Sequence, residues 1–272
     1  MELIALLPVF VSLIFIGAFA GFLAGLLGVG GGIVLVPCFF YSFQALGYNG
    51  PQLMQVCVAT SLATIIVTSI RSLQSHNRKG FVDWKILQKW VPSIAIGAIC
   101  GAYLAASIGS IVLQLIFGGL GTLIGVYLVF GKQSWFLAEN LPKGITRWVL
   151  GSALGGLSVL LGIGGGSLGV PFMSLHQIAI HRAVGTAAGF GLAIAIPSTA
   201  FWLLVPVGSP ALPFNLGAVN FLVFLFIVPL TFIFVPLGAN LGHRLDAKPL
   251  KRVFGLFLLL VAINMMLQAL WG

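Results

Sequence analysis

The sequence predicts an all-α polytopic membrane protein made of two inverted-topology repeats. Of its 272 residues, 60% are hydrophobic and only 6% are charged, and the mean hydropathy is +1.15. Such a chain has too few charges to cover a water-facing surface. A Gly-Val-Gly-Gly-Gly run at 28–32, followed by Pro37, returns as Gly-Ile-Gly-Gly-Gly at 162–166, followed by Pro171. A glycine-broken helix that occurs twice is typical of transporters whose site lies at the breaks.

Apolar segments of helical length follow one another along the chain. About eight are counted as full spans: 3–27, 53–70, 89–107, 110–131, 147–162, 182–204, 214–236 and 252–271. The segments 33–43 and 167–180 are too short to cross a bilayer, and each directly follows a glycine run. We therefore expect each half to begin with a helix that breaks at the glycines and returns as a short helix. Three spanning helices then follow in each half.

The two halves correspond beyond the glycine runs. Residues 80–84, Gly-Phe-Val-Asp-Trp, resemble residues 217–221, Gly-Ala-Val-Asn-Phe, and Thr60 and Thr186 hold similar places after each break. We therefore expect one integral membrane domain in three parts. These parts are a first transmembrane repeat at 1–131, a cytoplasmic linker at 132–146 and a second transmembrane repeat at 147–272.

The distribution of Lys and Arg predicts the orientation of each loop. Basic residues gather at 71–89, 132–147, 182 and 243–252, whereas 44–52, 108–110 and 205–213 carry none. The positive-inside rule places the basic loops in the cytoplasm. The loop before Asp83 is therefore inside, and its counterpart before Asn220 is outside, which makes the repeats inverted and puts both termini outside. Because no Lys or Arg precedes Arg71, we interpret the first segment as a retained helix and not a signal peptide.

Glycines in this chain occur in two kinds of pattern. Glycines four residues apart are typical of close helix packing, and they occur at Gly17/Gly21/Gly25, Gly97/Gly101, Gly121/Gly125 and Gly151/Gly155. The triplets that end at Gly32 and Gly166 differ, because three glycines in a row weaken a helix where lipid favours one. The short helix after each triplet would present unpartnered N–H groups and a positive dipole end, which together suit an anion.

The predicted substrate-binding residues are the glycines of both triplets and the hydroxyl residues nearby. They are Gly30, Gly31, Gly32, Thr60, Ser61, Gly164, Gly165, Gly166, Ser167 and Thr186. Hydrogen bonding within their own helix is the alternative for the hydroxyls, and helix packing is the alternative for the glycines. The second copy has Ser167 where the first has Ile33, so the two half-sites need not contribute equally.

Titratable residues offer little further chemistry. All four acidic residues lie in or near loops, which argues against a proton relay or Na⁺ site on a buried carboxylate. His176 and His181 flank the second short helix and are possible proton carriers, with an interfacial histidine as the alternative. We expect no metal site, no cofactor and no enzymatic activity, because the three cysteines are scattered and no catalytic set occurs.

On these residues the chain resembles the TauE/SafE sulfite exporter family, also called TSUP. The resemblance covers nearly the whole chain. It rests on the doubled glycine motif with its proline and on residues 59–61, 80–84, 181–186 and 238–265. It implies a multi-pass inner-membrane protein that moves sulfur-containing anions such as sulfite, sulfoacetate or related organosulfonates.

We therefore expect a secondary transporter that exports such an anion across the inner (plasma) membrane. Its expected partners are that anion and the lipid bilayer. Nucleic acid is not expected, because the net charge of +9 is confined to loops. Export of an anion from a negative interior is downhill by about 2.3 kcal/mol per charge per 100 mV, so it needs no coupling carboxylate. The alternatives are an importer coupled to H⁺ or Na⁺ and a membrane scaffold or assembly factor.

Overall fold

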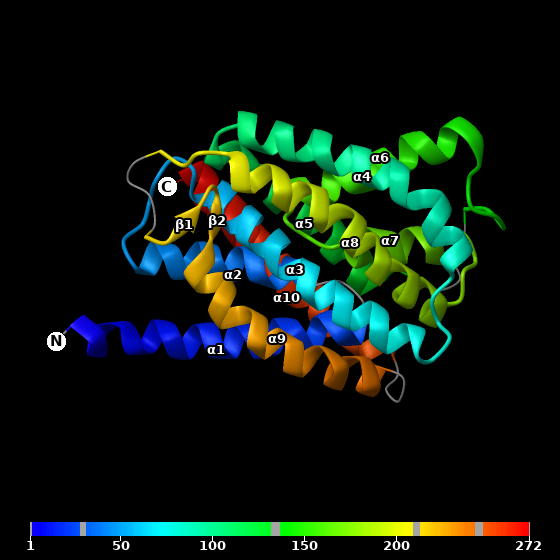
Figure 1. Ribbon diagram of the computed structural model, residues 1–272, viewed down its shortest axis with the longest axis horizontal. Coiled ribbons are helices and arrows are strands. Elements are labelled where there is room, and N and C mark those ends of the chain that lie inside the picture. The colour runs from blue at the N-terminus through cyan, green and yellow to red at the C-terminus, as the bar shows by residue number, and fades with distance from the viewer. Residues whose placement is uncertain (1, 28–30, 132–136, 209–212, 243–246, 272) are drawn as a thin grey trace.

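The computed structural model describes residues 2–27, 31–131, 137–208, 213–242 and 247–271. Within these residues the chain forms ten helices and one short hairpin (Figure 1). The first repeat contains α1 (Glu2–Leu27), α2 (Gly32–Ala45), α3 (Leu53–Asn77), α4 (Trp84–Ser107) and α5 (Ser110–Phe130). The second contains α6 (Gly144–Leu160), α7 (Gly165–Ser174), α8 (Ile180–Leu204), β1 (Asn215–Leu216), β2 (Val219–Asn220), α9 (Phe221–Gly242) and α10 (Ala247–Trp271). The predicted all-α polytopic class is confirmed.

Six helices of the described chain are long and apolar enough to cross a membrane: α3, α4, α5, α8, α9 and α10. The short returning helices are α2, with 14 residues, and α7, with 10 residues. Helix α6 has 17 residues and reaches about 25 Å, less than the hydrocarbon core of about 30 Å. The prediction that 147–162 is a full span is therefore not met. The glycine break ends α6 at Leu160 and leaves it shorter than a full span.

The helices pair in a pattern that exchanges the two repeats. Helix α1 packs along α9, and its counterpart α6 packs along α4. Helix α2 lies on α3 as α7 lies on α8, while α3 packs on α8 and α5 packs on α10. Each repeat thus lays its first helix on the fourth helix of the other repeat (Figure 1). This interlocked arrangement is the one expected of repeats related by a pseudo-two-fold axis.

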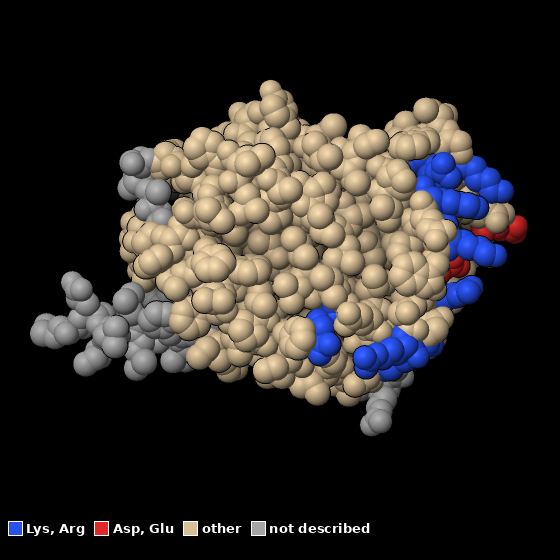
Figure 2. Space-filling view, in the orientation of Figure 1, with Lys and Arg blue, Asp and Glu red and all other residues tan. Residues whose placement is uncertain are grey.

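Charge is concentrated at one end of the molecule. In Figure 2 the visible Lys and Arg side chains lie in the right-hand half, most of them at the right-hand end. In the same orientation, α1 begins and α10 ends at the left (Figure 1). Helix α6 starts and α7 ends toward the charged end, with Lys143 and Arg147 at the start of α6. The α1–α2 hairpin opens toward the opposite end, so the two re-entrant hairpins enter from opposite ends.

The glycines spaced four apart lie where helices touch. A Cβ at Gly21 would lie 2.6 Å from the Cα atom of Thr231 on α9, and one at Gly101 would lie 2.7 Å from the Cα atom of Gly156 on α6. A Cβ at Gly125 would lie 2.7 Å from the Cγ atom of Leu259 on α10. Because real Cβ atoms do not come so close, any larger residue would push these helices apart. The predicted packing role of these glycines is confirmed.

The hairpin before α9 differs from the expected apolar helix beginning at 214. Strands β1 and β2 pair antiparallel, with Asn215 opposite Asn220 and Leu216 opposite Val219. The turn between them begins at Gly217, whose φ is 56°, and a glycine with positive φ at the first turn position closes a two-residue hairpin well. The prediction of a helix over 214–220 is therefore wrong. The hairpin delays the start of α9 until Phe221.

Candidate functional site

The second glycine run ends one helix and starts another. At the end of α6, the N–H of Gly162 donates to the carbonyl of Val159 and the N–H of Ile163 donates to the carbonyl of Ser158, both at 2.9 Å. With φ of 60° at Gly162, this is a Schellman motif, which needs a left-handed residue. Helix α7 begins at Gly165 after its N-cap residue Gly164. The break is thus shorter than expected, because Gly165 and Gly166 already belong to the first turn of α7.

The first glycine run makes a similar start for α2. Gly31 is the N-cap residue, with φ of 77°, and its carbonyl accepts from the N–H groups of Val34 and Leu35 at 3.1 Å. Gly32 is the first helical residue, and Gly30 lies outside the described residues. Within the described chain, neither α2 nor α7 has a side-chain cap or an acidic residue in its first turn. The positive ends of both helices are therefore not neutralised by a carboxylate of their own first turn.

The two breaks are in direct contact. A Cβ added to Gly32 would meet the carbonyl oxygen of Gly162 and would lie 2.9 Å from the Cα atom of Ile163. The same carbonyl accepts a hydrogen bond of 2.8 Å from the hydroxyl of Ser61 on α3. Only glycine at 32 permits this approach of backbone to backbone. Ser61 therefore hydrogen-bonds the first repeat to the break in the second repeat.

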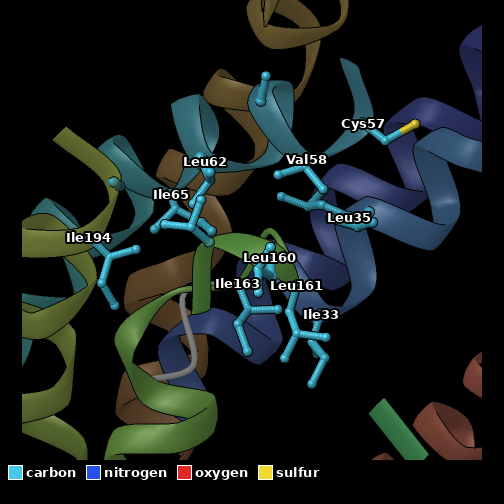
Figure 3. Close-up of a cluster of buried hydrophobic side chains, with 14 of the residues drawn as sticks. Ile33, Leu35, Cys57, Val58, Leu62, Ile65, Leu160, Leu161, Ile163 and Ile194 are labelled. Carbon is cyan, nitrogen blue, oxygen red and sulfur yellow. The ribbon is translucent and has the colours of Figure 1, made fainter. Parts of the chain in front are cut away.

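Apolar side chains surround the junction of the two breaks. Figure 3 shows Ile33 and Leu35 of α2, Leu62 and Ile65 of α3, and Ile163 of the second break gathered in one cluster. Each of these five side chains is at most 2% exposed. The junction is therefore buried and lined by apolar side chains. Gly31, Gly32 and Gly162 all lie in close contacts with neighbouring atoms here.

Thr60 and Thr186 are both used in hydrogen bonds between the repeats. The hydroxyl of Thr60 on α3 accepts from the N–H of Asn220, and the hydroxyl of Thr186 on α8 accepts from the N–H of Asp83, each at 2.9 Å. Both threonines are fully buried. Asp83 caps α4 by accepting from two of its N–H groups, and Asn220 accepts from the N–H of Val223 at the start of α9. The two bonds are equivalent under the exchange of repeats.

Unpartnered hydroxyls lie beside the start of α7. Ser167, the third residue of α7, is 4% exposed, and its Oγ has no hydrogen-bond partner among the described residues. The same holds for Ser69 on α3, which is 1% exposed. A Cβ at Gly191 would meet the Oγ of Ser69 and would lie 3.6 Å from the backbone nitrogen of Gly165. The Oγ of Ser69 and the first amide nitrogen of α7 therefore both lie close to Gly191, in a contact that leaves no room for a larger residue at 191.

The sequence interpretation missed Ser69 and a second orphan hydroxyl, Ser158, which is 1% exposed near the end of α6. A signal was present in the sequence. Six hydroxyl residues fall within a short stretch of the segment that forms α3, the most buried candidate span of the described chain. They are Thr60, Ser61, Thr64, Thr68, Ser69 and Ser72. Thr64 and Thr68 donate to carbonyls of α3 itself, whereas the hydroxyls of Ser69 and Ser72 have no hydrogen-bond partner among the described residues.

The two predicted proton carriers lie away from the breaks. His176 is 6% exposed, and its Nδ1 lies 2.8 Å from the carbonyl oxygen of Phe172. His181 is exposed, with its ring 5.4 Å from that of Phe81. Both follow the C-terminal end of α7, which lies about 15 Å from its start at 1.5 Å per residue. Neither histidine is placed to exchange a proton with a group at the start of α7.

Two broken helices that enter from opposite ends and touch at the centre of a bundle define a multi-pass membrane protein of the transporter class. The chain belongs to the TauE/SafE family, since the model of the family described as sulfite exporter TauE/SafE matches residues 13–265.

Curated relatives agree with this class. The chain is 33% identical over 256 residues to a "Probable membrane transporter protein" of Haemophilus influenzae, a match that covers 93% of this chain and 96% of that one. It is 26% identical over 282 residues to the "Probable membrane transporter protein YunE" of Bacillus subtilis, which covers 97% and 99% of the two chains. A relative of the same description in Methanocaldococcus jannaschii is 26% identical over 270 residues, covering 95% of this chain and 97% of that one. No solved structure matches the chain.

Proposed function

We propose that this protein exports a small sulfur-containing oxyanion, such as sulfite, sulfoacetate or a related organosulfonate, and binds it at the start of α7. The observation that carries the proposal is the approach of two hydrogen-bond donors to Gly191. There the Oγ of Ser69 and the amide nitrogen of Gly165 face the same point. N–H groups at a helix start and a hydroxyl are donors, which suits an oxyanion with several acceptor oxygens.

The two half-sites contribute differently in this proposal. Ser167 supplies a second hydroxyl in the first turn of α7, whereas Ile33 stands in the first turn of α2 and is 2% exposed. The start of α2 adds its dipole but no side-chain donor. The anion is therefore held by the start of α7 in the second repeat together with Ser69 on α3 in the first repeat. The first repeat closes over it through the contact of Gly32 with Gly162.

In this proposal the buried, apolar junction corresponds to a closed stage of the transport cycle. Asp83 lies at the charged end and Asn220, the last residue of β2, lies toward the other end, so one cross-repeat hydrogen bond to a threonine lies toward each end. Opening toward one end separates one of these pairs and leaves the other intact. Exit from a negative interior is driven by the membrane potential, at about 2.3 kcal/mol per charge per 100 mV.

Flux measurements in proteoliposomes with an imposed potential test this proposal. Radiolabelled sulfite is loaded inside, and its release is followed at both polarities. We expect release that rises with an interior-negative potential and falls at least about tenfold in Ser167→Ala, since an anion loses one charge-assisted hydrogen bond. Ser107→Ala is the matched control, because Ser107 is exposed and bonds only within α4, to the carbonyl of Tyr103.

Three outcomes would contradict the proposal. Transport that follows a Na⁺ or H⁺ gradient and ignores the potential would indicate the coupled importer. Equal rates in wild type, Ser167→Ala and Ser107→Ala would remove α7 from the site. A folded protein that moves neither sulfite nor sulfoacetate would favour the scaffold.

A further inference from the structure

A polar cavity lies at the charged end, away from the junction of the breaks. It has a volume of about 400 Å³ and lies between the start of α4, the segment 139–143 and the start of α6. Four cationic side chains line it, against two acidic ones: Lys85, Lys89, Lys143 and Arg147, with Asp83 and Glu139. Figure 2 shows blue and red side chains gathered at this end of the molecule. The cavity is therefore a concave site with an excess of positive charge.

The cationic side chains that line this cavity are not paired with the carboxylates that line it. Asp83, one of the two carboxylates, lies 4.0 Å from Arg182, which is not part of the lining. Among the described residues, no ion pair involves the four lining cations. The Nε atom of Arg147 is buried, and it has no hydrogen-bond partner in the described part of the chain. A buried guanidinium nitrogen without an acceptor is costly unless a ligand supplies one.

The start of α6 adds to the same charge. Its N-cap residue is Lys143, and within the described chain this helix has neither a side-chain cap nor an acidic residue in its first turn. A Cβ at Gly144 would find open space, with no described atom within 4 Å. By contrast, α4 beside it is capped by the carboxylate of Asp83. The free N–H groups and dipole of the 17-residue α6 thus face the region that Lys143 and Arg147 line.

Apolar and aromatic side chains border this region. Trp84 at the start of α4 is 47% exposed and Trp148 on α6 is 39% exposed. Ile145 and Val149 on α6 are 77% and 61% exposed. Exposed tryptophans are typical of the headgroup level of a bilayer, and exposed aliphatic residues on the same helix suit acyl chains. A ligand with a charged head and apolar chains fits this combination of a basic cavity and an apolar border.

We propose that this cavity binds a phosphate group, delivered by the headgroup of an anionic phospholipid of the leaflet at the charged end. The phosphate accepts from Arg147, from the lysines and from the open start of α6. The acyl chains lie along Ile145 and Val149. The site is independent of the proposed transport site, because α6 places about 25 Å between its start and the glycine break. Basic pockets at helix ends recognise anionic headgroups in this way.

Native mass spectrometry of the purified full-length protein in detergent tests this site. It is titrated with phosphatidylglycerol and, separately, with phosphatidylcholine of the same chain length. We expect saturable binding of phosphatidylglycerol only, weakened about tenfold in Arg147→Gln by loss of a charge-assisted hydrogen bond. Arg252→Gln is the matched control, since Arg252 is exposed on α10 and does not line the cavity. Lys143→Gln, at an exposed position, replaces Arg147→Gln if the latter fails to fold.

The source of the phosphate group is resolved by competition. Inorganic phosphate that binds alone, displaces the lipid and loses affinity in Arg147→Gln would identify a soluble anion as the ligand of the same site. Phosphatidylglycerol binding that phosphate does not displace supports the lipid. Equal binding of the two lipids, or equal binding by wild type and both cavity variants, overturns the proposal. None of these outcomes depends on transport.

Discussion

The hydroxyl of Thr186 accepts a hydrogen bond of 2.9 Å from the backbone N–H of Asp83 and so joins α8 to the start of α4. Thr60 and Asn220 form the same bond at the same distance between α3 and the start of α9. In each pair the cap residue of one repeat depends on a threonine of the other. These two bonds connect the interlocked repeats near the helix starts, where α4 and α9 enter the bundle.

Removing either threonine hydroxyl should destabilise the fold. Thr60→Val keeps the shape of the side chain but leaves the buried N–H of Asn220 without a partner, which costs about 1–3 kcal/mol. Thr60→Ser keeps the hydroxyl and serves as the control. Thermal unfolding in detergent measures the effect, and the same comparison applies at Thr186. A Val variant as stable as the Ser variant at either position would show that the bond contributes nothing.

Asp83 should tolerate replacement by asparagine far better than replacement by alanine. The Asp83→Asn variant keeps a side-chain cap on α4, as Asn220 does for α9, whereas Asp83→Ala loses it at a cost of about 0.5–2 kcal/mol. The ion pair with Arg182 adds little, because Arg182 is 59% exposed and the pair is 4.0 Å apart. Unfolding temperatures of Asp83→Asn, Asp83→Ala and wild type check this order. Asn and Ala variants of equal stability would assign the role of Asp83 to its charge.

Glycine-to-alanine changes should distinguish glycines at helix contacts from glycines that face open space, by their effect on stability. Gly21→Ala would force α1 away from the backbone of Thr231 on α9, and such overpacking costs about 1–3 kcal/mol. Gly119→Ala on α5 meets open space among the described residues, so the higher helix propensity of alanine makes it neutral or slightly stabilising. Both variants are compared by thermal unfolding. A destabilised Gly119→Ala together with an unchanged Gly21→Ala would refute the packing assignment.

Gly191→Ala tests the space proposed for the anion. The new methyl group collides with Ser69 Oγ, so both packing and transport should suffer. The double variant Gly191→Ala/Ser69→Ala removes the hydroxyl with which the methyl group collides, and with it the donor proposed to bind the anion. We expect thermal stability to recover in the double variant and sulfite flux to stay at least about tenfold below wild type, because a hydroxyl donor is lost. Flux that recovers together with stability would place the anion elsewhere.

His176→Gln and His181→Gln should leave transport unchanged. Both histidines lie beyond the C-terminal end of α7, about 15 Å from its start. His181 is exposed, and His176 lies against Phe172. Flux measured across a pH series should therefore coincide with that of wild type for each variant. A variant that loses the pH dependence of wild-type flux would restore that histidine as a proton carrier.

The sequence predicted the helical architecture because that architecture depends on local signals. Hydrophobic segments located the helices, and the repeated glycine run located both breaks. The spacing of Gly97 and Gly101 identified a packing face, which α6 occupies. Charge in the loops indicated the inverted order of the repeats. The apolar segments and the glycine spacing are each readable within about twenty residues of the chain, whereas the repeated glycine run and the loop charges are read by comparing the two halves.

The partners of individual hydroxyls could not be predicted, because they depend on contacts across the two repeats. Thr60 meets Asn220 only after both halves have packed, and nothing in its neighbourhood along the chain distinguishes it from Ser69, which has no described partner. The hairpin before α9 was missed because it is short and is followed directly by the strongly apolar segment that begins at Phe221. Gly217 was the available signal, since a glycine often marks a tight turn at a strand end.

Because the helices of the two repeats interlock, the first repeat cannot complete its packing until the second has been synthesised. When the first repeat leaves the translocon, the groove of α4 at Gly97 and Gly101 still faces lipid, because α6, which fills it, has not yet been made. Helix α1 likewise cannot complete its packing before α9 has been made. Insertion and final assembly are therefore separate events in this protein, and a nascent chain halted after α5 holds two vacant grooves that only its own second half completes.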